Sequence, residues 1–232
     1  MRASPKPALS EVETWVFDLD NTLYPARHNL FDLVDARIGA YIARLLGTDA
    51  VAARRLQKRY FRDYGTTLRG LMLRHGVIPE DFLAFVHAIP IERLPADPAL
   101  DHALSRLGGR KVVFTNASAA HAERVLARLG IARHFDGIFD IVAAEYVPKP
   151  EPAAYRRLLA RHRIVPERAV MVEDIARNLA PAADLGMTTV WVDGGHAWGA
   201  EGRDGPHIDH VIDDLTAWLG CLTGAGEASG GE

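Results

Sequence analysis

From about residue 94 onward, short apolar runs alternate with amphipathic stretches long enough to form helices. Parallel strands need a long crossover between them, and such crossovers are usually right-handed and helical. The alternation therefore predicts an α/β fold with a parallel sheet. The expected strands lie at residues 14–19, 111–115, 137–142, 169–173, 188–192 and 210–212. The expected crossover helices lie at residues 98–107, 117–129, 151–162 and 177–185.

Residues 28–90 have a different character, because their apolar side chains recur at steps of three and four. That period is typical of helices with one buried face. The first such face joins Leu30, Val34, Ile38, Tyr41 and Leu45. Further helical patterns lie at residues 50–63, 68–75 and 80–87. We expect an α-helical cap, residues 25–94, inserted into an α/β core made of residues 14–24 and 95–220.

Composition excludes several classes of protein. The chain is 48% hydrophobic and 25% charged, and its formal net charge of −3 gives no basic field for a nucleic-acid polymer or an anionic membrane. No apolar run approaches the ~20 residues of a spanning helix. Residues 1–13 lack the apolar middle of a signal peptide and suggest a flexible tail, and the Gly-rich end, residues 221–232, suggests a disordered one. The single cysteine, Cys221, fits a cytoplasmic location.

Polar side chains recur where the predicted strands end or in the loops that follow. In chain order they are Asp18 and Asp20, Thr115 and Asn116, Lys149, and Glu173 with Asp174. Ligands of open parallel sheets bind outside the carboxyl ends of the strands. The sequence therefore predicts one site at that edge of the sheet, with carboxylates, a hydroxyl and an ammonium group.

This combination suits phosphoryl transfer. Asp18 can attack phosphorus and form an acyl phosphate. Asp20, two residues on and on the same side of an extended chain, can protonate the leaving alcohol and then activate water. Carboxylates suit Mg²⁺, for which Asp18 and Asp174 are the obvious ligands. Lys149 adds positive charge, and the two polar residues at the end of the second strand, Thr115 and Asn116, can bind phosphoryl oxygens.

The motifs "DLDNT", "FTN", "PKP" and "VED", in this order, resemble those of the haloacid-dehalogenase-like hydrolases. The resemblance implies a Rossmann-like core, with Asp18 as the phosphate-accepting nucleophile and Asp20 as the acid/base. It also implies that the backbone carbonyl of Asp20 joins Asp18 and Asp174 as a Mg²⁺ ligand, and that Thr115 and Lys149 hold the phosphoryl group. Dehalogenases lack a carboxylate at the position of Asp20, so its presence favours phosphate esters.

Longer stretches, such as "VFDLDNTLYP", "YGTTLRG" and "VEDIARNLAPAADLGM", look like the pyrimidine 5′-nucleotidase branch. This resemblance implies a small phosphorylated substrate, a nucleoside monophosphate such as UMP or CMP. The "YGTTLRG" stretch would face the leaving group, which makes Tyr64 and Arg69 candidates for substrate binding. The Asn matching Asn178 helps to order the metal-binding loop in that branch. Glu173 is either a partner of the metal ligands or only a charge at a strand end.

Other functions remain open on the sequence. One is a phosphatase of sugar phosphates or of phosphoglycolate, and another is a phosphomutase, which would require a bisphosphate activator. A third, from another class, is a catalytically idle binding module. The intact set speaks against the idle module, because an inactive relative has no chemical reason to keep Asp18, Asp20, Thr115, Lys149 and Asp174.

Overall fold

A parallel sheet organises the computed structural model, which describes residues 8–224. Within this range six strands pair in the order β3-β2-β1-β4-β5-β6, and all the pairs are parallel. This is the strand order of a doubly wound Rossmann-type sheet, so the predicted fold class is confirmed. The strands are β1 (Thr14–Phe17), β2 (Arg110–Phe114), β3 (Gly137–Phe139), β4 (Ala169–Glu173), β5 (Thr188–Val192) and β6 (His210–Ile212).

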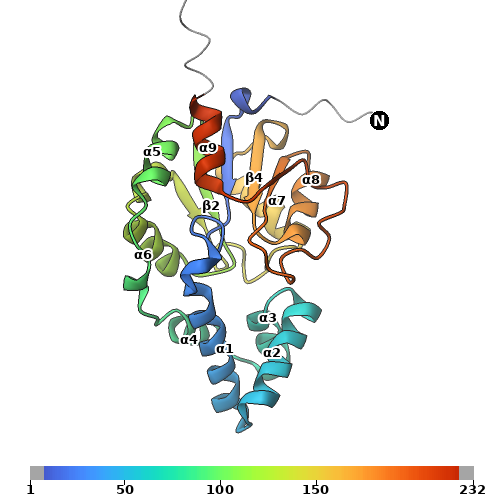
Figure 1. Cartoon of the computed structure of the whole chain (residues 1–232). Coiled ribbons are helices and arrows are strands. Elements are labelled where there is room, and N and C mark those ends of the chain that lie inside the picture. Colours follow the sequence, from blue (N-terminus) through green and yellow to red (C-terminus); the bar gives the residue numbers. More distant parts are fainter. Residues whose placement is uncertain (1–7, 225–232) are drawn as a thin grey trace, which may run out of the picture.

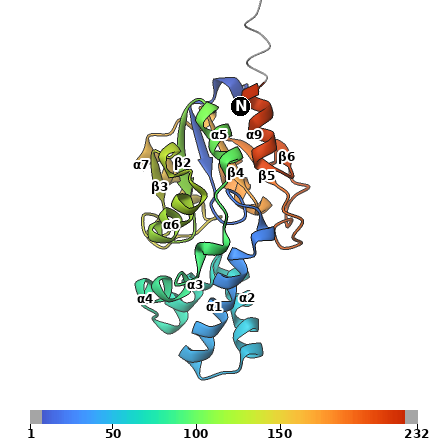
Figure 2. The same cartoon turned by 60° about the vertical axis from the view of Figure 1, so that its left-hand side comes forward.

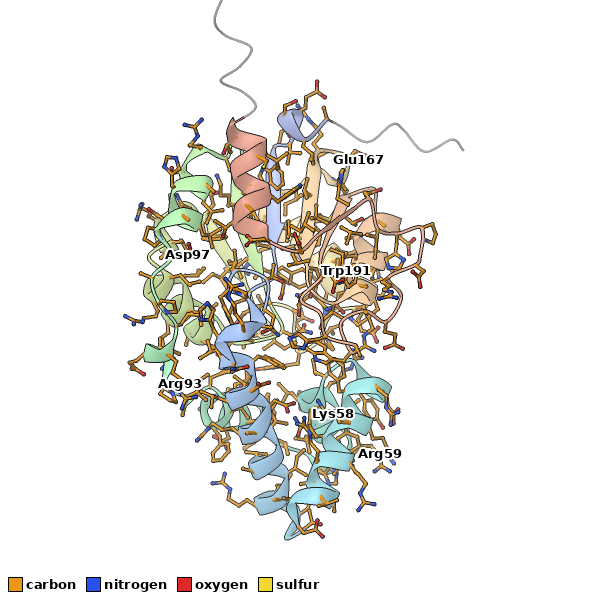
Figure 3. All side chains as sticks on the ribbon, in the orientation of Figure 1. Lys58, Arg59, Arg93, Asp97, Glu167 and Trp191 are labelled. Carbon is orange, nitrogen blue, oxygen red and sulfur yellow. The ribbon has the colours of Figure 1, made fainter. Side chains whose placement is uncertain are left out.

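Helices cover both faces of the sheet. The side chains of β1 alternate between these faces and contribute to the hydrophobic core on each side. Trp15 and Phe17 point to one face, where they pack with α5 (Pro98–Arg106), α6 (Ala119–Leu129) and α9 (Leu215–Gly224). Val16 points to the other face, where it packs with α7 (Pro152–His162) and α8 (Ala180–Asp184). Trp191 of β5 belongs to this second core (Figure 3).

Three predicted elements are shorter than the sequence pattern indicated. The first strand ends at Phe17 rather than at residue 19, because the chain turns there and Leu23 N donates to Leu19 O. The third strand ends at Phe139 rather than at residue 142, and turns follow it. The helix predicted at residues 177–185 is divided into a 3-10 turn, Ala176–Leu179, and α8. Pro181 explains the division, because it has no N–H to continue an α-helical ladder.

A block of helices lies between β1 and α5 in the chain. It consists of α1 (Leu30–Leu46), α2 (Ala50–Tyr64), α3 (Thr67–His75) and α4 (Pro79–Val86). Asp49 and Thr66 cap α2 and α3 by accepting from Ala52 N and Arg69 N. Both views show this block beyond the end of the sheet toward which β1 runs (Figures 1 and 2). The carboxyl ends of the strands therefore face the helices, while the exact domain boundaries stay predictions.

The predicted tails lie partly outside the described residues. Leu9–Glu11 form a 3-10 turn, and Val12 is buried against the core. The prediction of a disordered end from residue 221 is wrong for residues 221–224, because α9 continues to Gly224 and Leu222 packs against the core. In the described part of the chain, none of the helices combines the length and the apolar character needed to cross a membrane.

Candidate active site

Asp18 lies at the point where the strand order reverses. Its amide continues the ladder between β1 and β4 by donating to Val172 O at 2.9 Å. Strands β2 and β4 flank β1, so the residues after these three strands meet at one crevice. Asp18 follows β1, Thr115 follows β2, and Asp174 follows β4. All three residues are buried.

Lys149 reaches into this crevice from the loop after β3. Its Nζ lies 2.5 Å from Asp18 Oδ1 and 2.6 Å from Glu173 Oε2, and it also donates to the backbone oxygen of Phe114 at 3.0 Å. The Lys149 side chain is 2% exposed, so water screens these contacts little. Burial alone would lower the pKa of Lys149, but the carboxylates of Asp18 and Glu173 raise it, so the group stays charged.

Three buried carboxylates lie together here. One oxygen from each of Asp18, Glu173 and Asp174 falls within 4.8 Å of the others. Burial, with the charge of Glu173 next to it, raises the pKa of Asp18 to about 7 and the pKa of Asp174 well above its ordinary value. Among the described residues, only the ammonium of Lys149 offsets these negative charges. An all-oxygen cluster with excess negative charge fits a hard divalent cation such as Mg²⁺.

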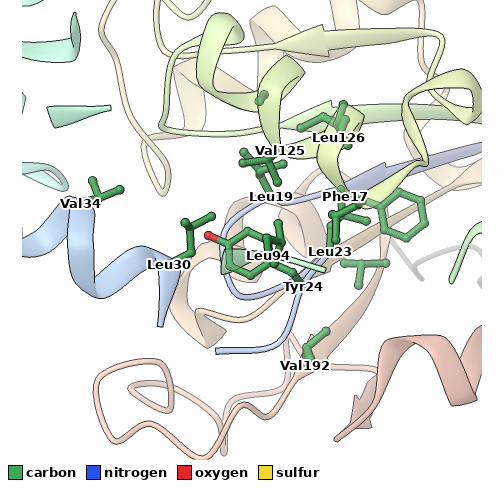
Figure 4. Close-up of a cluster of buried hydrophobic side chains, with 14 of the residues drawn as sticks. Phe17, Leu19, Leu23, Tyr24, Leu30, Val34, Leu94, Val125, Leu126 and Val192 are labelled. Carbon is green, nitrogen blue, oxygen red and sulfur yellow. The ribbon is translucent and has the colours of Figure 1, made fainter. Parts of the chain in front are cut away.

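Asp20 follows two residues after Asp18 and takes a different set of partners. Tyr24 Oη donates to its Oδ1 at 2.5 Å, and His121 Nε2 lies 3.3 Å from the same oxygen. Burial opposes ionisation, but these contacts outweigh it and lower the pKa of Asp20. The Tyr24 ring packs among buried leucines, including Leu23 and Leu94 (Figure 4).

Thr115 and Asn116 differ in what they can offer a ligand. Thr115 Oγ1 accepts from Ala117 N at 3.0 Å, and its own hydrogen has no acceptor within residues 8–224. The hydroxyl is therefore free to donate to a phosphoryl oxygen. Asn116 makes two hydrogen bonds with the backbone of Lys149. Asn116 Nδ2 donates to Lys149 O at 3.3 Å, and Lys149 N donates to Asn116 Oδ1 at 2.9 Å. These bonds hold the loop that carries Lys149, called the lysine loop below, and substrate binding by Asn116 stays a prediction.

Glu173 and Asn178 support the loop after β4. Glu173 is fully buried, and besides Lys149 it binds Ile175 N through Oε1 at 3.3 Å. Asn178 lies in the turn before α8, where its backbone oxygen accepts from the Tyr155 hydroxyl. Glu173 thus belongs to the carboxylate cluster itself, and is more than a charge at a strand end. The role of Asn178 in ordering the metal loop stays a prediction.

A cavity of about 830 Å³ opens between the carboxyl edge of the sheet and the helical block. The site residues Asp18, Asp20, Thr115, Lys149 and Asp174 all line it on the sheet side. The helical block adds an apolar wall, formed by Ile38, Phe61, Leu68, Phe82, Leu83 and Val86. It also adds polar side chains, among them Lys58, which is labelled in Figure 3. A phosphate at the carboxylates would therefore place its leaving group against the helices.

The structure does not bring Tyr64 and Arg69 to this cavity. Tyr64 packs edge-on against Tyr60, with ring centroids 5.5 Å apart. Arg69 Nη1 lies 3.8 Å from Glu151 Oε1, an ion pair between the helical block and the residue before α7. Neither residue is part of the cavity wall. Their predicted contact with the leaving group gains no support from this geometry.

Sequence reasoning missed several residues that hold the site. Thr22 donates to Asp18 Oδ2 at 3.2 Å, and Trp191 Nε1 donates to Asp174 O at 2.8 Å. Tyr24 and His121 hold Asp20, as described above. One signal was available, because Thr22 and Tyr24 each lie four residues after the aspartate they contact. No local signal pointed to Trp191 or His121, which come from distant elements.

Comparisons with known proteins agree with this geometry. The model of the haloacid dehalogenase-like hydrolase family matches residues 12–186, more than half of the chain. Phosphate metabolism protein 8 of Saccharomyces cerevisiae is 28% identical over 79% of this chain. The match covers 61% of the yeast protein, so the chain spans less than two thirds of that relative. Phosphoglycolate phosphatase of Rhodospirillum rubrum is 28% identical, over 93% of this chain and 94% of its own length.

A solved structure shows the same fold. CbbY from Rhodobacter sphaeroides, in complex with phosphate, superposes with a TM-score of 0.61, over 90% of this chain and 96% of its own. Its sequence identity is 21%, so this likeness bears on the fold alone. The family match and the arrangement of the strand-end residues lead to one conclusion: the chain belongs to the haloacid dehalogenase-like hydrolase family.

Proposed function

We propose that this protein is a Mg²⁺-dependent phosphomonoesterase that works through an aspartyl-phosphate intermediate. The observation that carries the proposal is the contact of Lys149 with Asp18 and Glu173, next to Asp174, at the bottom of a cavity that the helical block covers. Carboxylates for a cation, a buried ammonium and a free hydroxyl in one crevice meet the needs of a transferring phosphoryl group.

The reaction proceeds in two steps. An Asp18 oxygen bonds to phosphorus as the ester P–O bond breaks, and Asp20 gives its proton to the departing alcohol oxygen. Water then attacks phosphorus, Asp20 takes the proton of that water, and the bond between phosphorus and Asp18 breaks to free phosphate. Lys149 and the Thr115 hydroxyl hold the phosphoryl oxygens. Asp18, Asp174 and the backbone carbonyl of Asp20 would hold Mg²⁺, which when bound neutralises charge on the phosphoryl group.

Nucleoside 5′-monophosphates, and pyrimidine ones in particular, are the proposed substrates. The motif likeness to the pyrimidine 5′-nucleotidase branch supports this choice. The cavity supports it too, because about 830 Å³ and a wall with Phe61 and Phe82 would accommodate a sugar and a planar base. The relative named phosphoglycolate phosphatase supports a phosphate ester more generally.

A small phosphorylated acid is a second candidate for the substrate. The relative named phosphoglycolate phosphatase matches nearly the whole chain. Arg62 of α2 also lines the cavity, and no carboxylate pairs with it among the described residues. An unpaired guanidinium would suit the carboxylate of such a substrate.

One screen tests both proposals. Metal-stripped protein is assayed for phosphate release from UMP, CMP, ribose 5-phosphate and phosphoglycolate, with and without Mg²⁺. We expect release only with Mg²⁺ and the highest kcat/KM on UMP or CMP. A higher kcat/KM on phosphoglycolate would reject the nucleotide substrate, and no release from any ester would reject the phosphatase.

The matched variants are Asp18→Asn and Asp193→Asn. Asp193 directly follows β5 at the same edge of the sheet, but it binds Gly195 N and lies outside the cavity wall. Asp18→Asn should abolish turnover, because an amide cannot form the acyl phosphate. Asp193→Asn should keep it, and equal losses in the two variants would remove Asp18 from the mechanism.

A further inference from the structure

A buried pair of histidines adjoins the site and has no part in the mechanism above. His121 lies in the first turns of α6 and is 1% exposed. Its ring stacks on His87, with centroids 4.5 Å apart and planes inclined by 15°. His87 directly follows α4, so it belongs to the helical block, whereas His121 belongs to the core. The pair therefore joins the two parts of the molecule beside Asp20.

Both hydrogen bonds to the Asp20 side chain end on the same oxygen. Tyr24 and His121 contact Oδ1, at 2.5 Å and 3.3 Å. Oδ1 accepts in this contact whether Asp20 is ionised or carries its proton on Oδ2, so His121 Nε2 carries the hydrogen. Oδ2 has no hydrogen-bond partner within residues 8–224, and Asp20 lines the cavity. Oδ2 is therefore the oxygen that is free to meet the leaving group.

The other nitrogen of the His121 ring indicates that this contact is more than packing. Nδ1 is buried and has no hydrogen-bond partner in the described part of the chain. A buried polar atom without a partner costs free energy that an apolar side chain of similar size would not. An imidazole at this position is therefore best explained by its other nitrogen, which reaches Asp20.

His87 is itself held firmly. Its Nδ1 lies 2.9 Å from the hydroxyl of Ser118, the residue that caps α6, and its backbone oxygen accepts from Arg124 Nη1 at 2.9 Å. Both partners belong to the core, as does His121. The ring of His87 is thus held in place against His121 and limits the orientations that the His121 imidazole can adopt.

We propose that His121 is a positioning residue for Asp20. Together, the Nε2–H of His121 and the Tyr24 hydroxyl hold Oδ1, so that Oδ2 carries the proton and faces the leaving oxygen, while His87 fixes the imidazole. The proposal rests on the phosphatase function and adds to it the residues that align its acid. A correctly placed general acid contributes most when the leaving group is a poor one.

The test compares His121→Leu with His121→Gln, whose amide can still donate from the place of Nε2. The substrates are p-nitrophenyl phosphate, which releases a stable phenolate, and the best alkyl ester of the phosphate-release screen. Because both esters share the hydrolysis of the phosphoenzyme, in which Asp20 is the base, the readout is kcat/KM, which reports phosphoenzyme formation. We expect His121→Leu to lower kcat/KM about tenfold or more on the alkyl ester and by less than about threefold on p-nitrophenyl phosphate. His121→Gln should restore most of the lost kcat/KM.

His134→Leu is the matched control. His134 Nε2 lies 2.8 Å from Asp101 Oδ1, a pair of the same kind away from the cavity, so both rates should stay unchanged. In an Asp20→Asn background, His121→Leu should lower kcat/KM on the alkyl ester by less than about twofold, because the acid is already absent.

Equal losses on both esters would show a structural role and overturn the proposal, as would no loss on either. If His121→Leu fails to fold, Tyr24→Phe removes the other bond to Oδ1 and keeps the ring. That variant must then show the same dependence on the leaving group, and its absence would also overturn the proposal. A wild-type protein that releases phosphate from no ester would instead overturn the proposed function on which this inference rests.

Discussion

Lys149 is the residue on which the charge balance of the site depends. Replacing it with Met leaves the carboxylates of Asp18 and Glu173 buried without their cation. Breaking a buried pair in this way costs about 3–5 kcal/mol, so Lys149→Met should lower the free energy of unfolding by that order and abolish turnover. Urea unfolding and phosphate release measure the two effects.

Lys111→Met provides the control for Lys149. The ammonium of Lys111 is also buried, but it binds the backbone oxygens of Leu107 and Gly109 and lies away from the carboxylates. This variant should lose stability and keep its kcat. If both variants lost kcat equally, the loss would reflect general destabilisation and the role assigned to Lys149 would be wrong.

His87 should make the protein sensitive to acid. Its burial, and then the neighbouring His121, lower the pKa of His87 to about 3 from 6.5, although Asp20 opposes the shift and Arg124 adds to it. The unfolded chain takes up this proton below about pH 6.5 and the folded protein does not, so acid favours the unfolded chain. The free energy of unfolding should therefore fall as pH drops from about 6.5 toward 3.

The variant His87→Phe keeps an aromatic ring against His121 and removes the proton. Its free energy of unfolding, measured in urea between pH 7 and pH 4.5, should depend less steeply on pH than that of the wild type. An unchanged slope would show that other groups cause the acid sensitivity.

At the scale of elements, the turn between α2 and α3 sets the distance between the helical block and the lysine loop. Gly65 has a φ of +80°, and a Cβ added there would lie 3.0 Å from Pro148 Cγ and 3.3 Å from Lys149 O. Gly65→Ala should therefore displace the turn or the loop and lower kcat/KM. It should also lower the melting temperature, because a side chain is strained at this φ.

Gly76 offers a close control, since it follows α3 with a φ of +62° and a Cβ there would meet nothing within 4 Å. Gly76→Ala carries the same backbone cost without the collision. It should lower the melting temperature of the protein and leave kcat/KM unchanged. Equal kcat/KM values in the two variants would mean that contact with the lysine loop has no effect on the reaction.

The sequence predicted the ends of a strand well where local residues determine them, and less well where contacts with distant residues do. The strands at residues 169–173 (AVMVE) and 188–192 (TTVWV) were located to the residue, because short runs rich in apolar and β-branched residues define them. The end of β1 was missed by two residues, since the turn after Phe17 depends on tertiary contacts of Leu19 and Leu23. Strand ends also predicted that Asp18, Thr115 and Asp174 would meet, because a parallel sheet aligns its carboxyl ends.

Side chains from distant elements could not be located in this way. The contact of His121 with Asp20 joins residues 101 positions apart, and nothing in the sequence near either residue indicates it. For Tyr64 and Arg69 the family resemblance implies contact with the leaving group, whereas the structure shows contacts with Tyr60 and Glu151, so that role stays a prediction. Motif spacing fixes the residues on the sheet, but the packing of the helical block decides which of its side chains line the cavity.

For the whole molecule, Mg²⁺ should act as a stabilising ligand. The excess charge of Asp18, Glu173 and Asp174 opposes folding in the absence of a cation. A ligand at about 100 times its Kd stabilises the folded state by about 2.7 kcal/mol, so saturating Mg²⁺ should raise the melting temperature by several degrees and EDTA should reverse the rise. Differential scanning fluorimetry measures this shift.

Two variants make the thermal measurement specific. Asp174→Asn weakens the proposed cation site and should remove most of the Mg²⁺-dependent shift, whereas Asp193→Asn should keep it. A shift of the same size in both variants would place the stabilising Mg²⁺ elsewhere on the protein.

Trapping the phosphoenzyme tests the central claim most directly. Turnover with Mg²⁺ and the best ester is quenched in acid, and the acyl phosphate is reduced with borohydride, which converts a phosphorylated aspartate to homoserine. Peptide mass spectrometry should then find homoserine in place of Asp18, and its amount should fall to background when EDTA is added before the ester. Rapid phosphate release with no homoserine at this position, or with homoserine at another aspartate, would contradict the account.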